Sequence, residues 1–387
     1  MVIEPRRVEF VNKGAELMLY AILRKMKEAY PDAKFAMAPL KGAPYHKRAE
    51  LGLYQKGHLW RKGFQFGDLA ALLPQITRDR YGIVLNREVD VVLDAAGFAY
   101  GDQWRNNCLE LAYYSKVWKK NGTKSILLPQ AFGPYGNREN IKAMKTALDN
   151  VNLVFARDEV SYQHLVSIAG ERPNMKQAPD FTNLMAGIRS ENFDSNKNRS
   201  CIIPNYRMID KTSKSDSDAY VPFMIEITRH LFQKGKSPFI LVHEGANDLM
   251  LAEKIRDPVS QEISIVKETH PLRIKGIIGE SELVISSRYH GLVSALSQGV
   301  PALGTGWSHK YQTLFDDYSF PEGLLDVSMP VEEIYRNIDI LVEPDKNAML
   351  KKEIGIRGQS LKNESEKMWE EVFRVLEEGN SSSIRSF

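Results

Sequence analysis

Short apolar runs rich in β-branched residues alternate with segments of helical periodicity along most of the sequence. This alternation is typical of βαβ units, in which buried parallel strands are covered by helices. In the N-terminal half we expect strands at Val8–Val11, Lys34–Met37, Val89–Leu93, Ser125–Leu128 and Val151–Ala156. In the C-terminal half we expect strands at Cys201–Pro204, Ser237–Val242, Ile263–Val266, Leu283–Ser286 and Ala302–Thr305. The pattern therefore predicts an α/β fold with two mostly parallel sheets.

The two series of strands indicate two Rossmann-like domains facing a cleft, with a polar linker or mobile loop at 189–200. Residues 40–85 hold many aromatic and basic residues but few strand signals, so we interpret them as an insertion or a lid. Trp369, Val372, Phe373 and Leu376 form a helical apolar stripe, which predicts core packing. The expected divisions are 1–188 and 201–345 for the two domains, 346–378 for a C-terminal helical segment, and 379–387 for a disordered tail.

The composition excludes several classes of protein. The formal net charge is only +3, which argues against a nucleic-acid-binding protein. Two distant cysteines, Cys108 and Cys201, show no metal-ligand spacing, so we expect reduced core thiols and no metal site. The N-terminus does not resemble a secretory signal, and no apolar run is long enough to span a membrane. We therefore expect a cytoplasmic protein whose membrane contact is at most peripheral.

Common nucleotide and hydrolase motifs are missing, including the phosphate-binding loop and the dinucleotide fingerprint after the first strand. One Asp-x-Asp sequence occurs, at Asp216 and Asp218, of the kind that holds a metal-bound nucleotide sugar. It follows no expected strand, and Asp and Ser favour turns and helix caps. We interpret it as a solvated loop or a helix start.

The strongest local feature is the strand end that carries Arg288, Tyr289 and His290, followed by Gly291 at the start of a short helix. Ligands of parallel sheets bind at the carboxyl ends of strands. A helix N-terminus offers unpaired N–H groups to an anion, and an arginine and a histidine add a forked donor and a proton donor. The alternative is a structural arginine paired with a neighbouring acid and a histidine satisfied in the core.

A similar unit ends the strand Val151–Ala156. Arg157 follows it, Asp158 is expected to cap the next helix, and Gly170 fits the position after that helix. Arg157 is either structural or a second cation for the ligand. Two arginines from different domains would clamp a doubly charged small molecule.

Other strand ends carry weaker candidates, each open to the alternative of ordinary turn chemistry. A sugar ring suits the aromatic, amide and carboxylate groups near Asp102, and Lys310 is placed to reach the anion or is simply solvated. The candidates at these positions are Asn12, Asp102, Trp104, Gln130, His243 and Lys310.

Taken together, these residues resemble the polysaccharide pyruvyl transferases. The resemblance spans about residues 8 to 320, and the block from Ser287 to Gly291 is its most specific part. The other matching segments are Asn12–Glu16, Leu128–Pro134, Ala156–Ser161, Ala178–Asp180, Gly299–Gly304 and Lys310. The resemblance implies a GT-B-like fold and transfer of the enolpyruvyl group of phosphoenolpyruvate onto a sugar as a cyclic ketal.

By this resemblance Arg157, Arg288 and His290 hold phosphoenolpyruvate, with Tyr289 and Lys310 beside them, and His290 and Arg288 are the expected catalytic residues. Phosphoenolpyruvate is a co-substrate, so no cofactor is expected. The sequence departs from the family after Gly101-Asp102, where some relatives have a histidine for the sugar and this chain has Asn106 and Asn107. We therefore expect Asn107 on the acceptor side, with the carrier of the sugar left open. The other expected acceptor-binding residues are Asn12, Asp102, Trp104, Gln130 and His243.

Three functions are compatible with the sequence. The first is a pyruvyltransferase that modifies a sugar of an exopolysaccharide or cell-wall glycan precursor, either free or lipid-linked. The second is a GT-B glycosyltransferase that uses a nucleotide sugar, which requires a base pocket in the second domain. The third is a non-catalytic partner protein that has kept the fold. The oligomeric state is not predicted.

Overall fold

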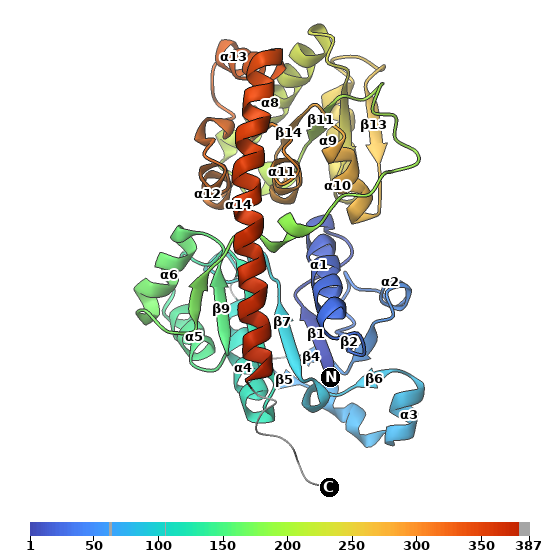
Figure 1. Cartoon of the computed structure of the whole chain (residues 1–387), viewed down its shortest axis with the longest axis vertical. Helices are drawn as coiled ribbons and strands as arrows, with labels where there is room; N and C mark the ends of the chain where they lie inside the picture. Colours follow the sequence, from blue (N-terminus) through green and yellow to red (C-terminus); the bar gives the residue numbers. More distant parts are fainter. Residues whose placement is uncertain (62–63, 105, 379–387) are drawn as a thin grey trace. The chain divides into compact units, whose positions relative to one another are not determined.

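The computed structural model describes residues 1–61, 64–104 and 106–378, which form two compact units (Figure 1). Unit 1 comprises Met1–Val11, Met18–Phe181 and the chain from Glu364 onward. Unit 2 comprises Asn12–Leu17 and Thr182–Asn363.

Unit 1 is built on an eight-stranded sheet in the order β10-β9-β8-β7-β1-β2-β3-β6, with every pairing parallel. Its strands are β1 (Val2–Arg6), β2 (Lys34–Met37), β3 (Tyr54–Lys56), β6 (Ile83–Val84), β7 (Val91–Asp94), β8 (Lys124–Gln130), β9 (Leu153–Ala156) and β10 (Met175–Gln177). A separate antiparallel pair is formed by β4 (Trp60–Arg61) and β5 (Phe64–Gln65). The insertion at 40–85 therefore extends the sheet through β3 and β6, which the sequence analysis did not predict.

The helices of unit 1 cover both faces of this sheet, as the alternating pattern predicts. They are α1 (Lys13–Ala29), α2 (Tyr45–Glu50), η1 (Gly67–Leu72), α3 (Gln75–Arg80), η2 (Asn86–Glu88), α4 (Asn107–Asn121), α5 (Arg138–Leu148), α6 (Glu159–Ala169) and η3 (Phe181–Leu184). The first turn of α1 and most of η3 are grouped with unit 2. Cys108 lies in the buried core, as expected.

The first strand is Val2–Arg6, and the prediction of Val8–Val11 was wrong. The strand escaped the apolar pattern because Glu4 and Arg6 are charged yet buried. Glu4 pairs with Lys56 of β3, and Arg6 pairs with Asp94 of β7 at 2.7 Å, so the charges are neutralised inside the unit.

Unit 2 contains a five-stranded parallel sheet in the order β13-β12-β11-β14-β15. Its strands are β11 (Ser200–Ile203), β12 (Pro238–Val242), β13 (Ser264–Lys267), β14 (Leu283–Ser286) and β15 (Ala302–Gly304), all close to the predicted positions. Its helices are α7 (Arg207–Asp210), α8 (Lys214–Gln233), α9 (Gly245–Arg256), α10 (Pro271–Gly279), α11 (Tyr289–Leu296), α12 (Lys310–Asp317), η4 (Pro321–Gly323), α13 (Val331–Val342) and the first part of α14 (Pro344–Glu377). Cys201 is buried in the core of this unit.

The division into units differs from the predicted domain boundaries. It falls between Phe181 and Thr182, and residues 189–200 belong to unit 2. Phe193 explains this, because it is buried in the core of unit 2 with its ring centroid 5.1 Å from that of Phe239. The stretch is polar but anchored by this one aromatic side chain.

The C-terminal helical segment is a single helix, α14, that contributes to both cores. Ile354 and Leu361 are buried in unit 2, whereas Trp369 packs edge-on against Phe181 in unit 1 with centroids 5.9 Å apart. The prediction that the stripe around Trp369 packs in a core is confirmed. The tail predicted to be disordered lies outside the described residues. Within the described residues, no helix combines the length and apolar character needed to traverse a bilayer.

Candidate active site

The loop between β14 and α11 in unit 2 carries the Arg-Tyr-His sequence and is fixed by its own side chains. The Ser286 hydroxyl accepts a hydrogen bond from the Arg288 N–H and donates one to the Arg288 carbonyl, both at 3.0 Å. Gly291 lies so close that a Cβ there would be 2.6 Å from Ser286 Oγ. The tight turn therefore requires glycine at this position, and it presents the N-terminus of α11 next to Arg288.

Ser287 lies between the last residue of β14 and Arg288, and it makes three hydrogen bonds with buried side chains. Its carbonyl accepts hydrogen bonds from Asn205 Nδ2 at 2.8 Å and from the Tyr311 hydroxyl at 3.0 Å. Its hydroxyl accepts one from the Tyr220 hydroxyl at 2.7 Å. All four residues are buried, so the backbone that positions Arg288 is rigidly connected to the core.

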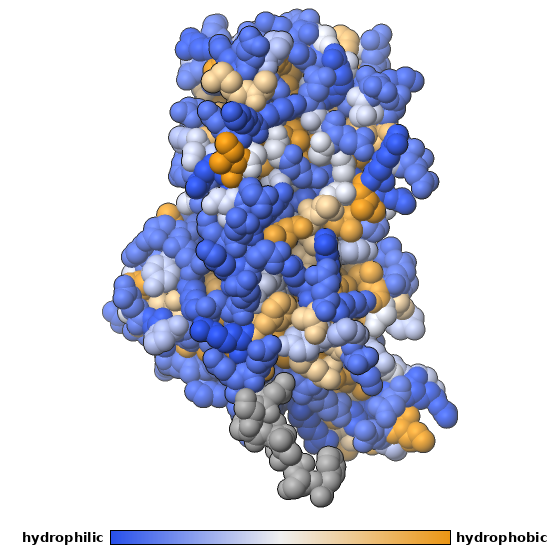
Figure 2. Space-filling model, viewed as in Figure 1, coloured by the Kyte–Doolittle hydropathy of each residue, from blue (hydrophilic) through white to orange (hydrophobic). Residues whose placement is uncertain are grey.

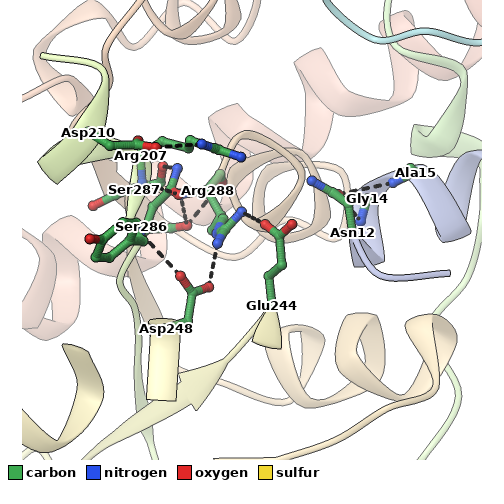
Figure 3. Close-up of polar contacts among 12 residues, drawn as sticks. Asn12, Gly14, Ala15, Arg207, Asp210, Glu244, Asp248, Ser286, Ser287 and Arg288 are labelled. Carbon is green, nitrogen blue, oxygen red and sulfur yellow. Dashed lines mark hydrogen bonds and ion pairs between the residues drawn. The ribbon is translucent and has the colours of Figure 1, made fainter. Parts of the chain in front are cut away.

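The Arg288 guanidinium lies between two carboxylates, Glu244 and Asp248, which both pair with it (Figure 3). Burial disfavours its charged form, but the two carboxylates outweigh that effect and raise the pKa of Arg288. Burial also raises the pKa of the Asp248 carboxyl, against the opposing effect of Arg288. Arg288 is thus a charged group with acidic partners. This pairing agrees with the structural alternative given above, an arginine paired with a neighbouring acid. The use of Arg288 by a ligand stays a prediction.

His290, in the first turn of α11, packs directly against the start of α1. A Cβ added to Gly14 would lie 2.6 Å from Cγ of the His290 ring, so glycine is required there too. Asn12 caps α1, because its Oδ1 accepts hydrogen bonds from the N–H groups of Gly14 at 3.0 Å and Ala15 at 3.2 Å (Figure 3). The candidates Asn12 and His290 therefore lie in one cluster of unit 2.

His243 joins this cluster from the end of β12. It is buried, and burial lowers the pKa of its imidazole well below the ordinary value, with further lowering by Arg288, His290 and Lys13. Its Nδ1 has no hydrogen-bond partner among the described residues. A neutral histidine thus lies beside the charged arginine.

Lys310 begins α12 and lies among aromatic rings. Its Nζ is 5.2 Å from the ring centroid of Tyr289, 5.0 Å from that of Trp307 and 5.5 Å from that of Tyr311. These cation–π contacts hold the ammonium next to the Arg-Tyr-His loop. The structure thereby brings together the predicted residues Arg288, Tyr289, His290 and Lys310.

Arg157 occupies the corresponding position in unit 1, at the end of β9. It is buried, and its Nη1 donates to Asp180 Oδ2 at 3.1 Å. Asp158 caps α6 by accepting from the Ser161 N–H at 2.7 Å, and Gly170 ends the helix at φ +69°, as predicted. Asp180 is part of the Ala-Pro-Asp segment that the resemblance singled out.

The remaining acceptor candidates lie in unit 1, where they have structural surroundings of their own. Asp102 accepts hydrogen bonds from Asn137 N–H at 2.9 Å and from Asn140 Nδ2 at 2.8 Å, and these and other hydrogen bonds lower its pKa despite partial burial. Asn107 accepts from Arg7 Nη1 at 3.1 Å and donates to a backbone carbonyl. Gln130 is fully buried, and Trp104 is half-buried. Their contact with a sugar stays a prediction.

The Asp-x-Asp sequence lies at a helix start, and that interpretation is confirmed. Ser213 caps α8 by accepting from the Asp216 N–H at 3.2 Å. Asp216 also lines a hollow of about 470 Å³ in unit 2, together with Lys211, Trp307 and Asp326.

Sequence reasoning missed a pocket of about 400 Å³ in unit 1, at the carboxyl ends of β1, β2 and β3. Arg6 and Arg7 line it, and both pair with Glu110, at 2.6 and 2.7 Å. His58 faces it with Nδ1 3.1 Å from the Tyr114 hydroxyl, and burial and Lys56 lower its pKa. The only sequence signal was the unexplained wealth of aromatic and basic residues in 40–85.

Comparison with known families decides what kind of chain carries this site. We call Asn12, His243, Arg288, Tyr289, His290 and Lys310 the Arg288 cluster. A family model described as polysaccharide pyruvyl transferase matches residues 12–309, which include every residue of this cluster except Lys310. The chain belongs to the polysaccharide pyruvyl transferase family. The resemblance inferred from the sequence motifs is thereby confirmed, and a transferase is the activity that membership supports.

Solved structures similar to this family member show its fold. Anabaena Alr3699/HepE in complex with UDP-glucose has a TM-score of 0.55 at 13% identity, covering 96% of this chain and 100% of that one. UDP-GlcNAc 2-epimerase from Neisseria meningitidis bound to UDP-GlcNAc has a TM-score of 0.56 at 10% identity, with coverages of 97% and 100%. UGT73P12 of Glycyrrhiza uralensis has 0.55 at 10% identity, with coverages of 99% and 96%. No curated protein sequence matches the chain. These likenesses confirm a GT-B-like α/β fold with two parallel sheets.

Proposed function

We propose that this protein is a phosphoenolpyruvate-dependent pyruvyltransferase that forms a pyruvate ketal on a sugar of an exopolysaccharide or cell-wall glycan precursor, in the cytoplasm. Family membership supports the reaction class. The observation that carries the donor assignment is the cluster of Arg288, His290 and Lys310 around the N-terminus of α11. The proposal covers a nucleotide sugar, a lipid-linked oligosaccharide or a polymer as the carrier of the sugar.

The reaction joins two sugar hydroxyls to C2 of phosphoenolpyruvate. The first hydroxyl oxygen adds to C2 while a proton is delivered to the C3 methylene, which becomes a methyl group. The second hydroxyl oxygen then replaces the phosphate at C2 and loses its proton. One proton therefore ends on carbon, one leaves with phosphate or a base, and no electrons are exchanged with an external redox partner.

The residues of the Arg288 cluster suit these steps. His290 is proposed to deliver the proton to C3, because an imidazole exchanges protons near neutral pH. Arg288, Lys310 and the N–H groups at the start of α11 are proposed to stabilise the leaving phosphate. Glu244 is the more exposed of the two carboxylates on Arg288, so we propose that the anion displaces Glu244 while Asp248 keeps the guanidinium in place.

Unit 1 supplies the remaining proposed contacts. Arg157 is proposed as the second cation for the doubly charged donor. The acceptor sugar is proposed to bind the polar groups of unit 1, with Asp102, Trp104, Asn107 and Gln130 as the sequence candidates. The pocket that includes Arg7, His58 and Glu110 offers charged and aromatic groups of the kind that recognise a sugar.

Thermal unfolding with and without phosphoenolpyruvate tests the donor assignment. At a ligand concentration about 100-fold above Kd, binding should stabilise the protein by roughly 2.7 kcal/mol. Arg288→Lys should lose this shift, because an ammonium cannot replace the forked donor. Arg229→Ala, which removes an arginine from a pair with Glu226 in the same unit, should keep it. A full shift in Arg288→Lys would reject Arg288 as the donor site.

One observation favours a second candidate, a GT-B glycosyltransferase that uses a nucleotide sugar. The hollow of about 470 Å³ in unit 2 has Trp307 for stacking and Asp216, Asp326 and Lys211 as polar groups. A panel of nucleotide sugars belongs in the same unfolding experiment. Stabilisation by a nucleotide sugar without any response to phosphoenolpyruvate would replace the pyruvyltransferase proposal with this one.

A further inference from the structure

The insertion in unit 1 exposes large apolar side chains in an unusual concentration. Among the described residues, seven large apolar or tyrosine side chains are more than 60% exposed, and five of them lie between residues 45 and 81. They are Tyr45, Leu69, Leu72, Ile76 and Tyr81, with Leu72 at 83% and Ile76 at 74%. The other two, Met349 and Ile356, are on α14.

Three of these apolar side chains and the neighbouring Leu73, which is 42% exposed, lie close together in the sequence. Leu69 and Leu72 lie on η1, Ile76 lies on α3, and Leu73 lies in the extended link between these two helices; all four side chains are exposed. A group of neighbouring exposed apolar side chains of this size typically marks an interaction surface. In Figure 2 orange atoms appear at the lower right, where Figure 1 places α3 at the edge of unit 1. We call these four residues the apolar stripe.

Beside the stripe is a hollow with tyrosines and arginines. Arg80 lies four residues after Ile76 on α3, and therefore on the same helix face. It lines a hollow of about 710 Å³ together with Arg48, Tyr45 and Tyr81. Tyrosine is the side chain, with tryptophan, that prefers the headgroup level of a bilayer, because one end is apolar and the other polar.

The charge of the protein is concentrated in the same insertion. Residues 40–85 contain eight Lys and Arg against three Asp and Glu, a net charge of +5, whereas the whole chain has +3. The basic excess of the sequence is thus concentrated in this segment. An apolar stripe in a basic segment is the combination that binds anionic membrane surfaces.

We propose that the apolar stripe and the arginine–tyrosine hollow form a docking surface for an anionic lipid bilayer. The stripe enters the boundary between headgroups and acyl chains, Tyr45 and Tyr81 lie at headgroup level, and the exposed cations Arg80 and Lys41 contact lipid phosphates. This surface belongs to unit 1, whereas the Arg288 cluster belongs to unit 2, and the inference does not depend on the pyruvyltransferase proposal.

Co-sedimentation of the full chain with vesicles tests the proposal. Vesicles of equimolar phosphatidylcholine and phosphatidylglycerol should bind the protein, and pure phosphatidylcholine should bind it much more weakly. Raising the salt concentration should weaken binding to the anionic vesicles, because the phosphate contacts are screened. The variant Leu72→Ser/Ile76→Ser should lower the partition coefficient by at least about tenfold, since two exposed apolar side chains no longer enter the bilayer.

The matched control is Met349→Ser/Ile356→Ser, which removes two equally large and similarly exposed side chains from α14. It should keep vesicle binding within about twofold of the original chain. Both variants replace surface residues, so their melting temperatures should stay close to that of the original chain. A lack of binding to anionic vesicles, or an equal loss in the control variant, would overturn the proposal. A concentration-dependent dimer that Leu72→Ser/Ile76→Ser abolishes, without vesicle binding, would show instead that a second copy covers the stripe.

Discussion

The two strand-end arginines, Arg157 in unit 1 and Arg288 in unit 2, occupy equivalent places in their sheets. Each follows a buried parallel strand, each comes just before a helix, and each is buried. Their surroundings differ. Arg157 pairs with the carboxylate of Asp180, whereas Arg288 lies between Glu244 and Asp248, with His243 and His290 close by.

The difference shows how one local motif can acquire two kinds of role. In unit 1 the loop carries a positive charge paired with Asp180 and a helix cap at Asp158. In unit 2 the same arrangement is surrounded by groups that can bind or release protons. Unit 2 is therefore the better candidate for the proton transfers of the proposed reaction, and Arg157 for electrostatic binding alone.

The largest expected difference concerns stability after each arginine is removed. Arg157→Met and Arg288→Met should each lower the free energy of unfolding by roughly 3–5 kcal/mol, because a buried carboxylate loses its cation. Arg288→Met should cost more, since Asp248 and Glu244 both lose the guanidinium. Chemical denaturation of the two variants measures the difference.

A double substitution separates the ion pair from simple packing. Arg157→Met with Asp180→Leu removes both charges of the pair in unit 1, and most of the lost stability should return. If the double variant is no more stable than Arg157→Met, then the single ion pair does not describe the energetics of this loop. An equal cost for Arg157→Met and Arg288→Met would remove the contrast between the two units.

A smaller effect on stability is expected at Gly14. The nearest atoms that a Cβ on Gly14 would meet belong to His290 of the Arg288 cluster. Gly14→Ala should push the His290 ring aside, lower stability by roughly 1–3 kcal/mol, and slow pyruvyl transfer by about a hundredfold through misplacement of the ring. Gly355→Ala is the matched control, because a Cβ on Gly355 in α14 meets nothing within 4 Å. It should stabilise the helix by about 0.5–1 kcal/mol and leave the rate unchanged.

The stability effect can be traced to the imidazole itself. When Gly14→Ala is combined with His290→Ala, the added methyl group no longer meets the ring, so its cost should largely disappear. An undiminished cost would place the strain elsewhere in the first turn of α1.

The strands described in unit 2 could be predicted from the sequence, four of the five because they are largely apolar and buried along nearly their whole length, whereas the edge strand β13 is partly exposed. Leu283–Ser286 was placed correctly, and the glycine and arginine after it revealed the loop. The first strand of unit 1 could not be found, since Glu4 and Arg6 are buried as ion pairs with residues 52 and 88 positions away. No local pattern reports partners at such a distance.

The same limit applies to the candidate site. Arg288, His290 and Lys310 were found from their place after strands, and the structure brings them together in unit 2. Glu244 and Asp248 were missed, because a carboxylate early in a helix resembles ordinary helix-start chemistry. Only the three-dimensional neighbours of Arg288 distinguish these acids from surface residues.

The smallest expected effect is a change in pH dependence at His243, which lies beside Arg288, His290 and Lys13. Its pKa is lowered in the folded protein, so below about pH 6.5 the unfolded chain binds a proton that the folded chain does not. Stability from this residue is therefore complete above pH 6.5 and declines as the pH falls, by at most about 1.4 kcal/mol per pH unit. His243→Leu should flatten the free energy of unfolding between pH 7 and pH 5, whereas His46→Gln at an exposed position should not. If the free energy of unfolding changes with pH equally in His243→Leu and in the original chain, then this imidazole already binds a proton in the folded protein. The assignment of His243 as a neutral neighbour of Arg288 would then be wrong.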